Sequence, residues 1–230
     1  MNRSSRRQIL PMTAMTGGGA LRNRCHTTCT WTRDGGTPDP LAGALEYAAD
    51  VMMWQGELLR IHVASTASAA MAELDQAQLI AGVGIEGDRY ATGLGTYSKR
   101  PHIDRQVTLI EVEVLETLAR DRGIELLPHE HRRNLTTHGV PLGHLVGQYF
   151  RIGDCVLYGG RLNVPCLYLE TLLGKRVFKP LINRSGLNCR IVLGGAIRSR
   201  DRIEWCDPAS LDLSIRLANE ETPLEPPPEI

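Results

Sequence analysis

The chain has 230 residues, of which 42% are hydrophobic and 23% charged, as in a soluble globular protein with one full core and room for an appendage. Lys and Arg number 26, and so do Asp and Glu, so the net charge is zero and nothing favours steering toward nucleic acid or an anionic membrane. No apolar run is long enough for a spanning helix, so we expect neither a nucleic-acid nor a membrane partner.

The first 55 residues differ in composition from the rest of the chain. Glycine and proline are frequent there, and only residues 41–53 have the pattern of a short amphipathic helix. The extreme N-terminus is similar to a twin-arginine export signal, but polar residues follow in place of the apolar segment. We predict a flexible extension over residues 1–55, a domain over 56–216 and a disordered proline-rich tail over 217–230.

The cysteines favour a reducing compartment. They lie at positions 25, 29, 155, 166, 189 and 206, and no two of them form a Cys-x-x-Cys pair. A disulfide framework is unusual in a chain of this size without an export signal. A metal clip around Cys25 and Cys29 lacks a second pair of ligands. We therefore expect reduced thiols and a cytoplasmic location.

The first elements of the predicted domain follow in chain order. Residues 58–63 are typical of a strand, whereas the small and polar residues 64–81 indicate a loop or a short helix. Residues 82–90 contain three glycines, which indicates tight turns. Residues 106–110 are strand-like, and residues 111–122 carry an apolar stripe at helical spacing that stops at a glycine.

Short strands separated by glycines make up the second half of the domain. Residues 167–173 have the pattern of a helix. Strand-like segments are predicted at residues 133–137, 148–152, 155–158, 190–193, 196–198 and 202–205. Many short strands with few helices indicate a barrel, so the predicted fold class is mainly β, a closed barrel with a few short helices.

Four ordered stretches of the chain carry a resemblance to a known family. They are residues 84–89 (GIEGDR), 105–111 (RQVTLIE), 132–139 (RRNLTTHG) with 145–153, and 165–170 (PCLYLE) with 186–190 and 194–198. In this order they resemble the MOSC domain, named after the C-terminal domain of molybdenum cofactor sulfurases, and its small stand-alone bacterial members in particular. The resemblance implies a MOSC-like β-barrel that binds a pterin-based molybdenum cofactor. An aminotransferase-like sulfurase domain does not fit in the remaining residues, so we expect no pyridoxal phosphate.

The sequence departs from the family pattern in two places. Many members have another cysteine a few residues before the Pro-Cys pair, where this chain has Asn163 and Val164. That difference weakens the case for a persulfide relay between paired thiols. Near the end, Arg200 precedes Asp201 where a glycine is usual, so the geometry of that turn is left open.

Cys166 is the residue that we expect to bind the metal and to be catalytic. Molybdenum prefers soft anionic ligands, and a thiolate is the softest ligand that a protein supplies. The resemblance places the ligand cysteine here, after Pro165 at a loop-to-helix junction, where a helix N-terminus favours the thiolate. On spacing alone, Cys166 would be a small buried apolar residue. The cysteines in strand-like segments are expected to be structural, with Cys189 the alternative thiol.

A polar group at the start of the third stretch is expected to bind the phosphate and the pterin edge of the cofactor. Arg132, Arg133 and Asn134 form its densest part, since a planar guanidinium donates two hydrogen bonds to one anion, and Thr136 adds a hydroxyl. On a strand, Arg132 and Arg133 would point to opposite faces, so only one of them, Arg133 by analogy, should face the site. The alternative is a solvated basic edge.

Asp88, Arg89 and Arg190 complete the expected cofactor-binding set. The glycines before Asp88 would let backbone N–H groups approach an anion, although the motif lacks the ending of a P-loop. Alternatively, Asp88 caps a turn and Arg89 pairs with it. The spacing of His129 and His131 suits no zinc pair, and we expect both side chains to be exposed.

The resemblance implies an oxidoreductase that reduces N-hydroxylated bases or related N–O compounds by oxygen-atom transfer to the metal. The sequence has no dinucleotide-binding fingerprint and no iron–sulfur cysteine pattern, so we expect a separate electron-donor reductase as partner. Two alternatives stay open, because the fold alone does not choose between roles. They are a non-catalytic carrier of the cofactor, or of sulfur as a Cys166 persulfide, and a barrel that serves only as an interaction module.

Overall fold

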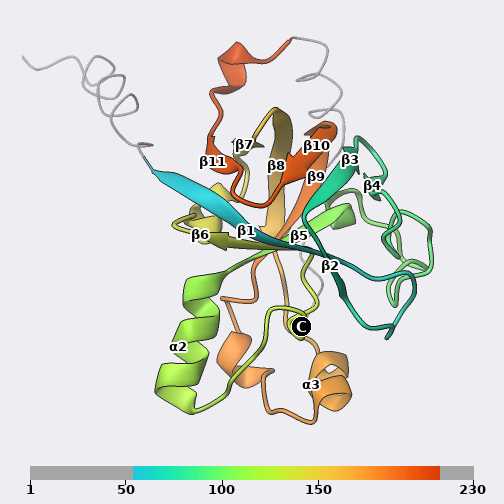
Figure 1. The fold of residues 1–230 in the computed structure, drawn as a ribbon, viewed down its shortest axis with the longest axis vertical. Coiled ribbons are helices and arrows are strands. Elements are labelled where there is room, and N and C mark those ends of the chain that lie inside the picture. The colour runs from blue at the N-terminus through green and yellow to red at the C-terminus, as the bar shows by residue number, and fades with distance from the viewer. Residues whose placement is uncertain (1–53, 213–230) are drawn as a thin grey trace, which may run out of the picture. The chain divides into compact units, whose positions relative to one another are not determined.

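The computed structural model describes residues 54–212, so the predicted tail, most of the predicted extension, and Cys25 and Cys29 lie outside the described residues. The strands of the barrel are β1 (Gln55–Val63), β5 (Val107–Glu111), β6 (Leu135–His138), β7 (Tyr149–Ile152), β8 (Cys155–Leu162), β9 (Leu187–Leu193) and β11 (Arg202–Trp205). They form one sheet in the order β11-β7-β8-β9-β5-β6-β1, which closes because β1 also pairs with β11 (Figure 1). Only β5 and β6 pair in parallel, so this is a closed, mixed seven-stranded barrel, which confirms the predicted fold class.

A smaller sheet packs beside the barrel. It contains β3 (Gln76–Ile80), β4 (Gly84–Ile85) and β10 (Gly195–Arg198), while β2 (Ala72–Leu74) extends the large sheet next to β1. The prediction of a loop or short helix over residues 64–81 holds for the loop at residues 64–71 and was wrong for residues 72–80, which form β2 and β3. Ala77 and Leu79 alternate with exposed residues along β3, but the strand is stabilised by pairing with β10, which lies more than a hundred residues later. A short segment whose partner is so distant gives little local signal.

Helices are few in the part of the chain that the structure describes, as predicted. The α-helices are α2 (Val112–Arg122) and α3 (Leu167–Leu173), and the 3-10 turns are η1 (Ile103–Arg105), η2 (Leu142–Leu145), η3 (Lys179–Leu181) and η4 (Pro208–Ser210). Gly123 ends α2 in the left-handed conformation at φ 62°, as its sequence position indicated. Within residues 54–212, no helix has both the length and the apolar character needed to cross a membrane.

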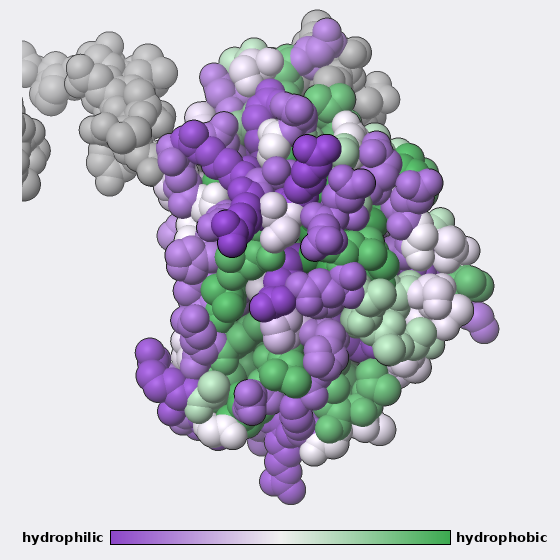
Figure 2. Space-filling view, viewed as in Figure 1, coloured by the Kyte–Doolittle hydropathy of each residue, from purple (hydrophilic) through white to green (hydrophobic). Residues whose placement is uncertain are grey.

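Two groups of buried side chains hold the site in place. The larger fills the barrel and includes Leu58, Leu109 and Phe150. The smaller lies under α2 and α3, which Figure 1 shows at the same end of the barrel, and it joins Leu118 of α2 to Leu169 of α3. Cys166 packs against this second group. The face drawn in Figure 2 is mostly hydrophilic, with hydrophobic side chains in smaller patches between.

The turn before β11 keeps a glycine-type backbone although it has no glycine at the critical position. Arg200 adopts φ 74°, and its N–H donates to the carbonyl of Leu58 at 2.7 Å. The Asp201 carboxylate accepts from the backbone N–H of Arg198 at 2.7 Å. The turn is therefore formed by Arg200 in a conformation that disfavours side chains with a Cβ.

Candidate functional site

A cavity of about 290 Å³ opens beside Cys166, between the start of the helix α3 and two loops from other parts of the chain. Within residues 54–212 its lining contains the arginines at positions 89, 105, 132, 133 and 161 and no aspartate or glutamate. The remaining lining residues are Tyr90, Thr96, Tyr97, Thr108, Asn163, Val164, Pro165, Cys166, Tyr168, Leu169 and Asn188. Guanidinium groups without competing carboxylates make this cavity suited to an anion.

Cys166 occupies the N-cap position of α3, with extended backbone at φ −131° and ψ 146°. Its side chain is only partly buried, whereas Cys155, Cys189 and Cys206 are buried and none of them lines the cavity. Burial raises the pKa of Cys155 to about 11 and the pKa of Cys189 well above its usual range. Among residues 54–212, Cys166 is thus the one thiol that reaches the cavity, and the alternative thiol Cys189 lies in the core.

Arg133 presents a buried cation to the same cavity. Its Nε donates to the carbonyl of Ser185 at 2.9 Å and its Nη2 to the hydroxyl of Ser185 at 2.6 Å. Burial lowers the pKa of Arg133 to about 10, while the nearby Cys166 sulfur acts in the opposite direction. The guanidinium therefore stays charged at neutral pH and presents a positive charge to the cavity.

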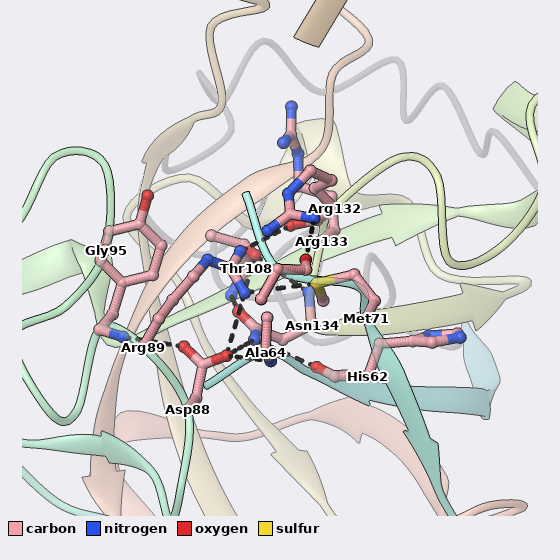
Figure 3. Close-up of polar contacts among 12 residues, drawn as sticks. His62, Ala64, Met71, Asp88, Arg89, Gly95, Thr108, Arg132, Arg133 and Asn134 are labelled. Atoms are coloured by element: carbon pink, nitrogen blue, oxygen red, sulfur yellow. Dashed lines mark hydrogen bonds and ion pairs between the residues drawn. The ribbon is translucent and has the colours of Figure 1, made fainter. Parts of the chain in front are cut away.

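Arg132 lines the cavity together with Arg133, contrary to the expectation that only one arginine would face it. That expectation assumed a strand, but β6 begins only at Leu135 and Arg132 has a left-handed backbone at φ 60°. The Arg132 Nη1 donates to the carbonyl of Ala69 at 2.7 Å, and its own carbonyl accepts from Arg89 Nη2 at 3.1 Å (Figure 3). Strand alternation does not apply to such a residue.

Asp88 and Arg89 form a buried pair at the edge of the site (Figure 3). The Asp88 carboxylate accepts from Arg89 Nη1 at 3.1 Å and from the backbone N–H groups of Ala64 at 3.2 Å and Tyr90 at 3.1 Å. Asp88 does not line the cavity, whereas Arg89 does, with its guanidinium 5.0 Å from the centre of the Tyr90 ring. The geometry matches the turn-capping alternative for Asp88.

Asn134, Thr136 and Arg190 lie behind the cavity wall and do not line it. Asn134 is hydrogen-bonded to Thr108, a lining residue, with 2.9 Å between Asn134 Oδ1 and the Thr108 hydroxyl. Arg190 donates to the buried Asp104 carboxylate at 2.7 Å.

His131 is buried, so the expectation that it would be exposed was wrong, whereas His129 is exposed as expected. The Nδ1 atom of His131 accepts from the backbone N–H of Arg133 at 2.9 Å, and its Nε2 lies 3.0 Å from the Thr136 hydroxyl. Burial lowers the pKa of His131 well below its usual value, and the positive charge of Arg133 lowers it further. The ring therefore supports the arginine segment as a neutral group.

The sequence reasoning missed Tyr97, which lies next to Cys166. Tyr97 and Cys166 line the same cavity, and burial, followed by the interaction with the Cys166 side chain, raises the pKa of Tyr97 to about 12. The Arg105 guanidinium lies 5.6 Å from the centre of the Tyr97 ring and donates to the Tyr97 carbonyl at 3.1 Å. Arg105 opens the second family-like stretch, but nothing local to Tyr97 indicated its place.

Asn163 stands in the cavity wall where many relatives were expected to carry a cysteine. Its side-chain amide donates to Asn188 Oδ1 at 2.8 Å, and Asn188 also lines the cavity. The position therefore contributes a neutral polar pair to the wall in place of a second thiol.

A model of the MOSC domain family matches residues 59–204 of the chain. Among solved structures, the YUAD protein from Bacillus subtilis is similar, with 20% identity, a TM-score of 0.57, and coverage of 66% of this chain and 97% of that chain. YiiM from Geobacillus stearothermophilus is also similar, with 14% identity, a TM-score of 0.52, and coverage of 72% and 82% respectively. At these identities the structures show the shared fold. No curated protein matches the chain.

Proposed function

The chain belongs to the MOSC domain family, and we propose that its arginine-lined cavity binds a pterin-based molybdenum cofactor with Cys166 as the metal ligand. One observation carries this proposal. Within residues 54–212, Cys166 is the only thiol that lines the cavity, and the same lining has five arginines and no carboxylate. A soft thiolate suits molybdenum, and guanidinium groups suit a phosphate. The residues present therefore fit the group.

The proposed activity is the reduction of N-hydroxylated bases or related N–O compounds. When bound, the cofactor supplies oxygen-atom-transfer chemistry, and the protein orients it. Arg132, Arg133 and Arg161 would hold the phosphate by charge-assisted hydrogen bonds. The Tyr97 phenol, with its pKa at about 12, stays protonated at neutral pH and lines the cavity together with Cys166, where its O–H would be available to donate a hydrogen bond.

The other predicted site residues act on the cofactor through the residues that line the cavity. Asp88 holds Arg89, Asn134 holds Thr108, and Thr136 contacts the buried ring that supports Arg133. Arg190 pairs with Asp104, directly before the lining residue Arg105. We assign these four predicted residues a positioning role.

Reduction fits the cavity better than sulfur transfer does. A persulfide relay needs a second thiol within reach, and in residues 54–212 the other cysteines are buried away from the cavity. The proposal includes a separate reductase as the source of electrons.

Replacing Cys166 with serine tests the assignment. In protein made by a host that synthesises the cofactor, Cys166→Ser should reduce a hydroxylaminopurine at least about 100-fold more slowly, since losing even a residue behind a metal ligand costs 10–100-fold. Pterin content should persist, because the arginines are intact, while the absorption of the metal changes. Cys206→Ser, at a buried position outside the cavity, is the matched control and should stay within a few-fold of the parent.

Two results would count against the proposal. Parent protein without pterin or molybdenum would remove the cofactor assignment. Cys166→Ser with parental activity and metal absorption would place the metal ligand elsewhere.

A further inference from the structure

A second hollow adjoins the arginine-lined cavity. It has a volume of about 900 Å³ and is lined by residues from two neighbouring segments, 82–93 and 97–106. Tyr90, Tyr97 and Arg105 line both the cavity and this hollow. The two spaces are therefore adjoining chambers with a shared wall of two aromatic rings and one guanidinium.

Cation–π contacts and hydrogen bonds hold the shared wall in place. Arg89 lies 5.0 Å from the centre of the Tyr90 ring, and Arg105 lies 5.6 Å from the centre of the Tyr97 ring. Arg105 also donates to the backbone carbonyls of Tyr97 and Arg100. Because Tyr97 lines both spaces and Cys166 lines the cavity, this wall lies between the second hollow and the Cys166 sulfur.

The two chambers differ in charge. Five arginines line the cavity, whereas in the described part of the chain the hollow has Arg105, in the shared wall, as its only arginine, lysine or carboxylate residue, with His102 as a further titratable group. Small and apolar residues form much of the rest, and Val83 and Ile103 are 45% and 37% exposed. Apolar lining with aromatic rings at one side accommodates a flat, uncharged ring, whereas an anion gains more from the cavity with five arginines.

We propose that the second hollow is the substrate chamber, in which an uncharged planar heteroaromatic ring lies against Tyr90 and Tyr97 with its N–O group directed toward Cys166. The reduction step in this inference rests on the proposed function. The binding of the ring does not, because it depends only on the hollow and its shared wall.

Filling the hollow separates ring binding from the chemistry at Cys166. Ile103→Trp adds bulk at a residue that lines the hollow and not the cavity, and Val83→Trp does so from the other segment. Leu94→Trp is the matched control, since Leu94 is 54% exposed in the same region and lines neither space. Binding of 6-hydroxylaminopurine to the full chain is measured by calorimetry. Reduction is followed with this base and with free hydroxylamine, which has no ring.

We expect Ile103→Trp and Val83→Trp to weaken binding of the base and to raise its KM by about tenfold or more, as misfits in a pocket do. Hydroxylamine reduction should stay within about twofold of the parent, because the cavity is unchanged. Leu94→Trp should match the parent in every measurement. Circular dichroism identifies a variant that fails to fold. If one tryptophan variant fails to fold, the binding and KM of the other one test the proposal.

The outcomes distinguish this inference from the proposed function. One outcome is that the parent binds the base and the tryptophan variants bind it weakly, while neither the parent nor any variant reduces a substrate. That result would support the substrate chamber and contradict the reductase assignment. If the parent does not bind the base, or the folded tryptophan variants bind it as the parent does, the chamber assignment is overturned. Equal losses with the base and with hydroxylamine would also overturn it.

Discussion

Replacement of Asn134 by alanine tests how the cavity wall is held. The Asn134 side chain is buried, and its Oδ1 accepts from the Thr108 backbone N–H at 3.2 Å and from the Thr108 hydroxyl at 2.9 Å. Its Nδ2 donates to the His62 carbonyl and to Asp88 Oδ2, each at 3.2 Å (Figure 3). One amide therefore joins the strands β1 and β5 to the loop that carries Arg89.

The cost of Asn134→Ala follows from the groups that lose a partner. A buried polar group left without a hydrogen bond costs about 1–3 kcal/mol. Asp88 keeps its bonds from Arg89 and Ala64, and the Thr108 hydroxyl keeps the bond from the Asn134 backbone N–H, so the loss falls mainly on the Thr108 N–H and the His62 carbonyl. Neighbouring losses are not additive, and the truncated site admits water. We expect a loss of about 2–4 kcal/mol in the free energy of unfolding, a large fraction of the 5–15 kcal/mol usual for a domain.

Urea denaturation followed by tryptophan fluorescence and by circular dichroism measures this loss. Asn163→Ala is the control, because the Asn163 side chain makes one hydrogen bond, to Asn188, in a partly exposed wall, and it should cost less than about 1.5 kcal/mol. A loss below about 1 kcal/mol for Asn134→Ala would refute the network argument. Normal stability with low cofactor content would instead indicate that Asn134 contacts the cofactor directly.

Three further predictions concern stability. Arg200→Gly should raise the free energy of unfolding by about 1 kcal/mol, because a non-glycine residue at φ 74° is strained, and an unchanged urea midpoint would contradict this. Gly160→Ala should cost about 3–5 kcal/mol, because its Cβ would lie 1.9 Å from the Asp104 carboxyl carbon and break the buried pair with Arg190, and thermal unfolding checks it. Burial lowers the pKa of His131 and His62 below 6.5, so the unfolded chain takes up more protons in acid, and stability present above about pH 6.5 should fall as the pH drops below it. Equal urea midpoints at about pH 7.5 and pH 5.5 would contradict that last expectation.

Local patterns were sufficient where an element depends on its own residues. The spacing of apolar residues placed α3 at residues 167–173 and β11 at residues 202–205, with the bounds that the structure has. Gly123 marked the end of α2, because a left-handed cap favours glycine. Cys166, the thiol that reaches the cavity, was identified by the resemblance to the MOSC domain, because spacing alone predicts a small buried apolar residue at that position.

Only the tertiary structure decided which side chains meet at the site. Strand β3 exists because it pairs with β10, and Asn134 is directed inward because His62, Thr108 and Asp88 surround its amide. Tyr97 lies about seventy residues before Cys166 in the chain, yet both residues line the same cavity, and no local pattern records that proximity. Periodicity reports on neighbours within a few residues, whereas a cavity wall is formed by segments that distant strand pairing brings together.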